Sequence, residues 1–207
     1  MTIVELAPEH ATAAAHLHLA GQSGTFLTEL GPGVLTVFYR ALPRSAAGFG
    51  FAAWSGQPDQ VIGFVSATTN TGQLFLEMAT RHLGELLPVT LARCLRHPIL
   101  LWHSAQTLAY PLLTREPGEK GAAELLSIMV APAWRGQGIG TRLLEALVGE
   151  CGRRGLTTLD VMVDAANQGA QRFYRRHHFV ERRQISLYGR ALCLYRRELP
   201  QAHPGGQ

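Results

Sequence analysis

The sequence contains few of the residues on which several classes of protein depend. Its three cysteines, at positions 94, 151 and 193, are scattered without the paired spacing of a zinc site or a disulfide framework. We therefore expect no metal site and reduced cysteines in a cytoplasmic protein. Charged residues are also scarce at 16%, and the net charge of +4 is carried almost entirely by arginine. This balance does not predict nucleic-acid binding.

Long hydrophobic runs are missing as well. The longest uncharged run, residues 98–114, contains two prolines and several polar side chains, so it is too short and too polar to cross a bilayer. The first residues, Met-Thr-Ile-Val-Glu, lack the basic start and apolar run of a signal peptide. We expect a cytoplasmic protein with no membrane contact. An apolar content of 46% over 207 residues predicts one sizeable core and a single domain.

Strand-like and helix-like patterns alternate along the first third of the chain. A proline at position 8 favours the first turn of a helix, and residues 55–59 form a turn-rich link between two β-rich runs, which predicts a hairpin. The expected strands are 2–6, 48–54 and 61–68, and the expected helical segments are 8–20, 26–27 and 34–42.

A strand followed by a glycine-rich loop and a helix is the most informative pattern. Residues 125–130 read as the strand and residues 135–140 as the loop, and leucines at 143, 144 and 147 mark the helix. The N–H groups of such a loop and the positive end of the helix together suit a pyrophosphate. A P-loop is excluded because the only lysine, Lys120, lies outside the loop. The Rossmann fingerprint is excluded because the glycine spacing differs.

The loop instead fits the pattern Arg/Gln-x-x-Gly-x-Gly/Ala, with Arg135, Gly138 and Gly140 at its fixed positions. On this pattern the sequence resembles the GNAT superfamily of acyl-CoA-dependent N-acetyltransferases. In that family the segment binds the pyrophosphate of coenzyme A.

A second segment adds to the resemblance. Residues 167–174 match the family's later motif, Asn-x-x-Ala-x-x-Phe-Tyr, and follow an alternating strand at 158–163. We expect the Asn167 side chain to cap the helix, with Tyr174 two turns later on nearly the same face. The family usually has glycine where this chain has His178, so we expect a positive φ angle at a residue that tolerates it poorly.

The resemblance implies a fold class and a reaction. The fold is expected to be α/β, a GNAT-like mixed and partly antiparallel sheet with helices on both faces. The chain is expected to be an enzyme, an N-acetyltransferase that moves an acetyl group from acetyl-CoA to a primary amine of a small molecule by direct attack in a ternary complex. Two alternatives stay open: a protein N-acetyltransferase, and a non-catalytic acyl-CoA-binding regulatory module.

Two residues are candidates for catalysis. Tyr174 matches the family's tyrosine that faces the CoA sulfur, and a phenol is still protonated at neutral pH, so we expect a general acid. The alternative is a ring that only packs in the core. Glu124 is the candidate base, because period-two alternation places it on one face with Leu126, Ile128 and Val130, among which its pKa could rise. The alternative is a solvated carboxylate near Lys120.

Contacts to acetyl-CoA are expected mainly from backbone. The resemblance implies that amides of the strand polarise the thioester and pair with the pantetheine arm, that Asn167 adds a side-chain contact, and that the loop and helix start hold the phosphates. Arginines 172, 175, 176, 182 and 183 are either a contact for the 3′-phosphate or an exposed face. Ser127, His16 and His18 are lesser candidates for the acceptor site. The predicted cofactor-binding set is Met129, Val130, Arg135, Gly136, Gln137, Gly138, Ile139, Gly140, Thr141 and Asn167.

One long segment has no counterpart in the usual fold, where a short turn joins the third and fourth strands. Residues 71–119 are rich in leucine, and Leu83, Leu87, Leu91 and Leu95 repeat every four residues. We expect a helical insertion within a single domain of residues 1–198, followed by a disordered tail at 199–207. The insertion has three open roles: filling the core, covering the acceptor site, or forming a homodimer contact.

Overall fold

The computed structural model describes residues 1–22, 26–56, 60–87, 90, 121–187 and 189–200. Its centre is a seven-stranded sheet with the order β1-β2-β3-β4-β5-β7-β6. Neighbouring strands are antiparallel except for the parallel pair β4 and β5. The strands are β1 (Thr2–Glu5), β2 (Gly48–Trp54), β3 (Val61–Thr68), β4 (Ala122–Val130), β5 (Thr158–Asp164), β6 (Val180–Leu187) and β7 (Arg190–Glu198).

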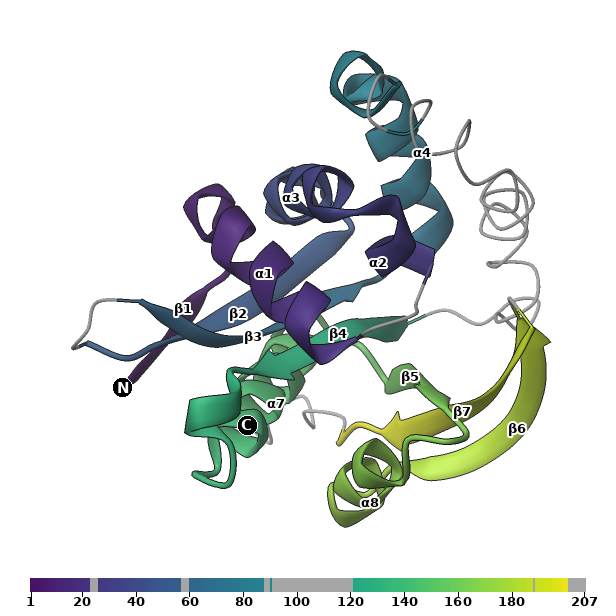
Figure 1. Cartoon of the computed structure of the whole chain (residues 1–207). Coiled ribbons are helices and arrows are strands. Elements are labelled where there is room, and N and C mark those ends of the chain that lie inside the picture. The colour runs from purple at the N-terminus through teal and green to yellow at the C-terminus, as the bar shows by residue number, and fades with distance from the viewer. Residues whose placement is uncertain (23–25, 57–59, 88–89, 91–120, 188, 201–207) are drawn as a thin grey trace, which may run out of the picture.

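Helices cover both faces of this sheet, so the expected α/β class is confirmed (Figure 1). Aromatic residues of α3 and β3, including Tyr39 and Phe64, pack with α1 and α4 on one face. Leucines 143, 144 and 147 of α7 pack on the other face, where Tyr174 of α8 joins them. The helices are α1 (Ala11–Gly21), α2 (Phe26–Leu30), α3 (Pro32–Ala41), α4 (Thr71–Arg81), α7 (Ile139–Arg153) and α8 (Gln168–Arg176).

Local signals in the sequence predicted several of these elements closely. The strands expected at 48–54 and 61–68 have those bounds as β2 and β3. Pro8 begins a 3₁₀ turn, Pro8–His10, which leads directly into α1. The expected tail begins too early, because Leu199 is buried and its N–H donates to the Thr157 carbonyl oxygen at 2.8 Å. Residues 201–207 lie outside the described residues.

The first part of the insertion is helical and belongs partly to the core. Leu74 and Met78 of α4 are buried against the α3 side of the sheet. The helix ends at Arg81, and the turn that follows changes which side chains face the core. Leu86 packs inward, whereas Leu83 and Leu87 are each 54% exposed. The body of the fold therefore does not bury these two leucines of the four-residue repeat. Leu91, Leu95 and the rest of the segment lie outside the described residues.

A β-bulge in β4 corrects one prediction about its faces. Ser66 of β3 pairs with Ser127, but the next residue of β3, Ala67, pairs with Leu125, so Leu126 is the additional residue. A bulge shifts the alternation of side chains by one position. Ile128 and Val130 consequently pack with the α7 cluster, whereas Glu124 contacts α4 on the opposite face. The expectation that Glu124 shares a face with Ile128 and Val130 is therefore wrong.

The two parallel strands separate after the bulge. Residues 122–125 of β4 pair with 158–161 of β5, and the pairing ends at Leu125 and Val161 although both strands continue. The ends of β4 and β5 thus flank a gap in the middle of the sheet. Backbone groups along a strand need hydrogen-bond partners. In this unpaired stretch, a ligand can make the hydrogen bonds that a neighbouring strand would otherwise make.

Candidate active site

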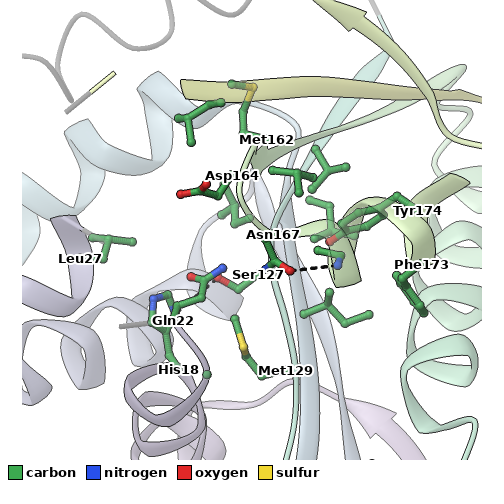
Figure 2. A pocket seen from close by; sticks show the side chains of 18 of the residues that line it. His18, Gln22, Leu27, Ser127, Met129, Met162, Asp164, Asn167, Phe173 and Tyr174 are labelled. Carbon is green, nitrogen blue, oxygen red and sulfur yellow. Dashed lines mark hydrogen bonds between the residues drawn. The ribbon is translucent and has the colours of Figure 1, made fainter. Parts of the chain in front are cut away.

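A large cavity occupies this gap. It has a volume of about 990 Å³, and its wall includes the last residues of β4 and β5, the end of α1, the start of α4 and much of α8. Figure 2 shows side chains from these elements around one space, with His18 and Gln22 on one side, Asn167 near the middle and Tyr174 on the other side. The cavity therefore passes through the sheet and connects its two helical faces.

The loop between β4 and α7 has the geometry of an anion site. Gly136 and Gly138 have φ angles of 77° and 74°, values that cost an L-residue side chain strain. Gly138 is the N-cap of α7, and no side chain caps this 15-residue helix. The first N–H groups of α7 are therefore left without intrahelical partners, next to the positive end of the helix dipole. This end of α7 offers donors to a phosphate group.

Side chains near the loop hold it in place. Arg135 donates from Nε to the Val130 carbonyl oxygen at 3.2 Å, and Gln137 donates to the carbonyl of Ala133 at 3.5 Å. Thr141 Oγ1 lies 3.1 Å from His177 Nε2, which connects the first turn of α7 to the end of α8. These contacts fix the loop in the free protein without filling the helix N-terminus.

Alternate residues at the end of β4 direct their backbone groups into the gap. The Ala131 N–H donates to the Ile62 carbonyl oxygen at 2.8 Å, so Ala131 directs its amide toward β3. Met129, two residues earlier, does the same. Val130 and Ile128 therefore direct their amides toward β5. Met129 contributes its side chain to the cavity wall.

Tyr174 and Asn167 meet on the α8 side of the gap. The Asn167 side chain accepts a hydrogen bond from the Ala170 N–H at 3.0 Å, which confirms the predicted helix cap. Tyr174 is only 5% exposed, and its ring packs edge-on against Phe173 and Phe179. Burial raises the pKa of its hydroxyl above the usual value of about 10. The side chain lines the cavity and extends toward Asn167 (Figure 2).

The helix that carries Tyr174 ends as expected. His178 has a φ angle of 64° and is the one non-glycine residue with a positive φ among the described residues. The Phe179 N–H then donates to the Tyr174 carbonyl oxygen at 3.1 Å, which turns the chain into β6. Of the five arginines considered for the 3′-phosphate, Arg175 pairs with Glu181 and Arg182 with Glu198.

Glu124 lies at the opposite side of the cavity from α8. Its Oε2 accepts a hydrogen bond from Thr71 Oγ1 at 2.5 Å, and both residues line the cavity. Phe75, one turn after Thr71, and Phe38 form an apolar wall beside them. A carboxylate in this position can attract an ammonium group or take a proton from an amine.

A buried network next to Glu124 was only partly anticipated. His18 Nδ1 lies 2.5 Å from the Tyr39 hydroxyl, which lies 3.2 Å from Ser127 Oγ. His18 and Ser127 both line the cavity, as expected, whereas His16 is exposed and lies outside it. Tyr39 was not predicted, because it is one apolar position among several in an ordinary amphipathic helix.

In the part of the chain that the structure describes, no cluster of three or more histidine, cysteine, aspartate or glutamate side chains is placed to hold a metal ion. No described helix is both long enough and apolar enough to span a membrane.

Comparison with known proteins agrees with this geometry. The sequence pattern of the acetyltransferase (GNAT) family matches residues 26–179. An uncharacterized N-acetyltransferase of Methanocaldococcus jannaschii is 36% identical over 64 residues, which is 31% of this chain and only 28% of that relative's length.

Two solved structures show the same fold at low sequence identity. The ribosomal-protein-S18-alanine N-acetyltransferase of Escherichia coli superimposes with a TM-score of 0.61 at 16% identity, covering 100% of this chain and 98% of that one. Arabidopsis thaliana NAA60, in complex with a bisubstrate analogue, superimposes with a TM-score of 0.60 at 16% identity, covering 97% and 100%.

Proposed function

This chain belongs to the acetyltransferase (GNAT) family, and from that premise we propose that it transfers an acetyl group from acetyl-CoA to a primary amine of a small molecule. Both substrates would occupy the cavity at once, and the amine would attack the thioester directly. The observation that carries this proposal is the cavity itself, which joins an uncapped helix N-terminus on one face of the sheet to a carboxylate on the other.

The residues present fit acetyl-CoA, which supplies the activated acetyl thioester. The amides at the start of α7, from Ile139 to Thr141, with Gly136 and Gly138 before them, would bind the pyrophosphate. The backbone of Val130 would pair with the pantetheine arm across the gap that β5 leaves open, and Asn167 would add a polar contact from the other side. The arm would thus take the place of a strand between β4 and β5.

Tyr174 would act as the general acid. The amine nitrogen forms a bond to the thioester carbon, the carbon–sulfur bond breaks, and the Tyr174 hydroxyl donates its proton to the leaving sulfur. Its raised pKa ensures that the proton is present throughout the physiological range. Because the Tyr174 side chain lines the cavity, its hydroxyl can point its proton at a sulfur bound there.

Glu124 would act as the base on the acceptor side. An amine enters mostly as an ammonium ion and must lose a proton before its lone pair can attack. Glu124 accepts that proton, directly or through a water molecule, while the Thr71 hydroxyl holds the carboxylate in position. The two candidate groups approach the cavity from opposite faces of the sheet, as a transfer between two substrates requires.

The experiment is an acetyl-transfer assay analysed by mass spectrometry, with acetyl-CoA as donor. Amino sugars, amino acids and simple alkylamines form one set of acceptors, and peptides with free N-termini form another. Acetylation of small amines supports the proposal. Transfer to peptides alone would identify a protein N-acetyltransferase instead. Binding of acetyl-CoA without transfer to either set would identify a regulatory acyl-CoA-binding module, and no binding at millimolar acetyl-CoA would reject all three.

A further inference from the structure

His18 has a buried ring nitrogen that makes no hydrogen bond to the described part of the chain. Only 1% of the residue is exposed, and its Nε2 has no hydrogen-bond partner among the described residues and no appreciable contact with solvent. A buried polar atom without a partner destabilises the folded state, so such atoms are rare in folded proteins. The residue nevertheless forms part of the cavity wall (Figure 2).

The other ring nitrogen indicates which tautomer is present. His18 Nδ1 and the Tyr39 hydroxyl are 2.5 Å apart, a separation typical of an O–H donor and shorter than N–H donors normally reach. We assign Tyr39 as the donor and Nδ1 as the acceptor. Because the Tyr39 hydroxyl has a single proton, Ser127 Oγ is then the donor in the 3.2 Å contact between Ser127 and Tyr39. A neutral imidazole then carries its hydrogen on Nε2. The ring is neutral at pH 7 because burial lowers the pKa of His18 to about 4.

We propose that His18 Nε2–H is the hydrogen-bond donor that recognises the acceptor substrate, and that it binds a neutral oxygen near the amine. This proposal rests on the acetyl-transfer function above and adds the substrate class: primary amines that carry an amide carbonyl, ether or hydroxyl oxygen close to the nitrogen. His18 belongs to the cavity wall, so a ligand reaches Nε2 once the wall side chains that cover this atom move aside.

The rest of the acceptor side of the cavity fits this class of molecule. Glu124 would bind the amine, and Leu27, Phe38 and Phe75 offer apolar surface to the carbon skeleton. A neutral donor beside a carboxylate favours a neutral oxygen, because a second negative charge on the substrate would be repelled by Glu124. Tyr39 is a positioning residue, since it contacts the imidazole and does not line the cavity, whereas Ser127 contacts Tyr39 and also lines the cavity.

The test compares acceptor preference in two isosteric variants. His18→Asn keeps a polar group where Nδ1 contacts Tyr39 but ends before the position of Nε2, whereas His18→Gln places an amide near the position of Nε2. The acceptors are phenylalaninamide, which has a carbonyl oxygen beside its amine, and 2-phenylethylamine, which has none. The ratio of their kcat/KM values is measured for each protein, so that differences in intrinsic amine reactivity cancel between proteins.

We expect the preference for phenylalaninamide to fall roughly tenfold in His18→Asn, mainly through KM, which is the scale of one hydrogen bond to a buried group. His18→Gln should restore most of the preference. His16→Asn, on the exposed face of α1, should leave it unchanged. An unaltered ratio in His18→Asn, with acetyl-CoA binding intact, would overturn the proposal.

A second readout separates this proposal from the function on which it rests. Nitrogen-15 NMR of the histidine-labelled wild-type protein with CoA reports the His18 tautomer directly. We expect the Nε2–H form before and after phenylalaninamide is added, with a shift of the Nε2 resonance on binding. An Nδ1–H tautomer, or an Nε2 signal that does not move at saturating phenylalaninamide, would reject the role of His18. Failure of the wild-type protein to acetylate any amine would instead reject the proposed function, and the NMR result would still decide the binding contact.

Discussion

The phenol of Tyr174 is enclosed by Phe173 and Phe179, and this environment decides its chemistry. Burial keeps the proton on the oxygen, so the group is able to donate and unable to act as a base at neutral pH. We expect Tyr174→Phe to lower kcat roughly 10²-fold with little change in acetyl-CoA affinity, because only proton donation is lost. Steady-state kinetics with chemistry shown to be rate-limiting would check this. An unchanged kcat would assign the ring to packing alone.

Glu124 is expected to matter most when the amine needs help to lose its proton. Glu124→Gln keeps the shape and the contact to Thr71 but cannot accept a proton, so kcat/KM at neutral pH should fall roughly 10²-fold. The deficit should shrink as the pH approaches the pKa of the amine, because solvent then supplies the free base. Glu145→Gln, at an exposed position of α7, is the control. A deficit that is constant with pH would contradict the role of a base.

His18 also makes stability depend on pH. Its pKa is about 4 in the folded state and about 6.5 when unfolded, so between these values the unfolded chain binds more protons. The stabilisation is complete above pH 6.5 and is lost as the pH falls toward 4. We expect the contribution of His18 to lower the free energy of unfolding by about 2 kcal/mol between pH 7 and pH 5. Urea unfolding of the wild type and of His18→Asn at both pH values measures this loss. Equal losses in the two proteins would contradict the low pKa.

Among the secondary-structure elements, α7 is the one whose N-terminus we expect to contact acetyl-CoA most directly. Acetyl-CoA at a hundred times its Kd should stabilise the folded protein by about 2.7 kcal/mol and raise its Tm. Gly138→Glu should abolish that shift, because it sets bulk and negative charge against the phosphates.

Gly155→Glu is the matched control for this substitution. Gly155 has a similar positive φ of 67° and open space around it, but it follows the other end of α7. Both variants should therefore lose about 1 kcal/mol to backbone strain, and only Gly138→Glu should lose the ligand shift in a thermal-unfolding assay. Loss of the shift in both would mean that the loop is not the binding site.

Elements whose signals are local could be predicted from the sequence, and those that depend on distant partners could not. The strands β2 and β3, the Asn167 cap and the positive φ of His178 follow from neighbouring residues. The bulge at Leu126 depends on how β4 pairs with β3, which local alternation does not reveal. The contact between His18 and Tyr39 likewise joins two separate helices, so the sequence suggested its members as isolated candidates at most.

On the scale of the whole molecule, the cavity combines segments from nearly the full length of the chain. The start of the insertion contributes directly to it, since Thr71 contacts Glu124 and Phe75 forms part of the wall. The insertion therefore begins in the cavity wall, at the end where we propose that the acceptor binds. Its helix α4 is also anchored in the core by Leu74 and Met78, so removal of residues 71–81 would damage the fold as well as the site.

Leu83 and Leu87 allow the outer part of the insertion to be tested without that damage. Both are 54% exposed, so replacing them with glutamine removes apolar surface and leaves the described core intact. We expect the double variant to keep the wild-type unfolding free energy and the same acetyl-CoA affinity, because the pyrophosphate site lies at α7. Acceptor kcat/KM or self-association, measured by sedimentation, should decrease, since exposed apolar side chains of this kind can contact a substrate or a second copy of the chain. Leu74→Ala is the contrasting variant, with an expected loss of about 2–5 kcal/mol in stability. If acceptor use and association state both stay unchanged in the double variant, these two leucines neither cover the site nor form a dimer contact.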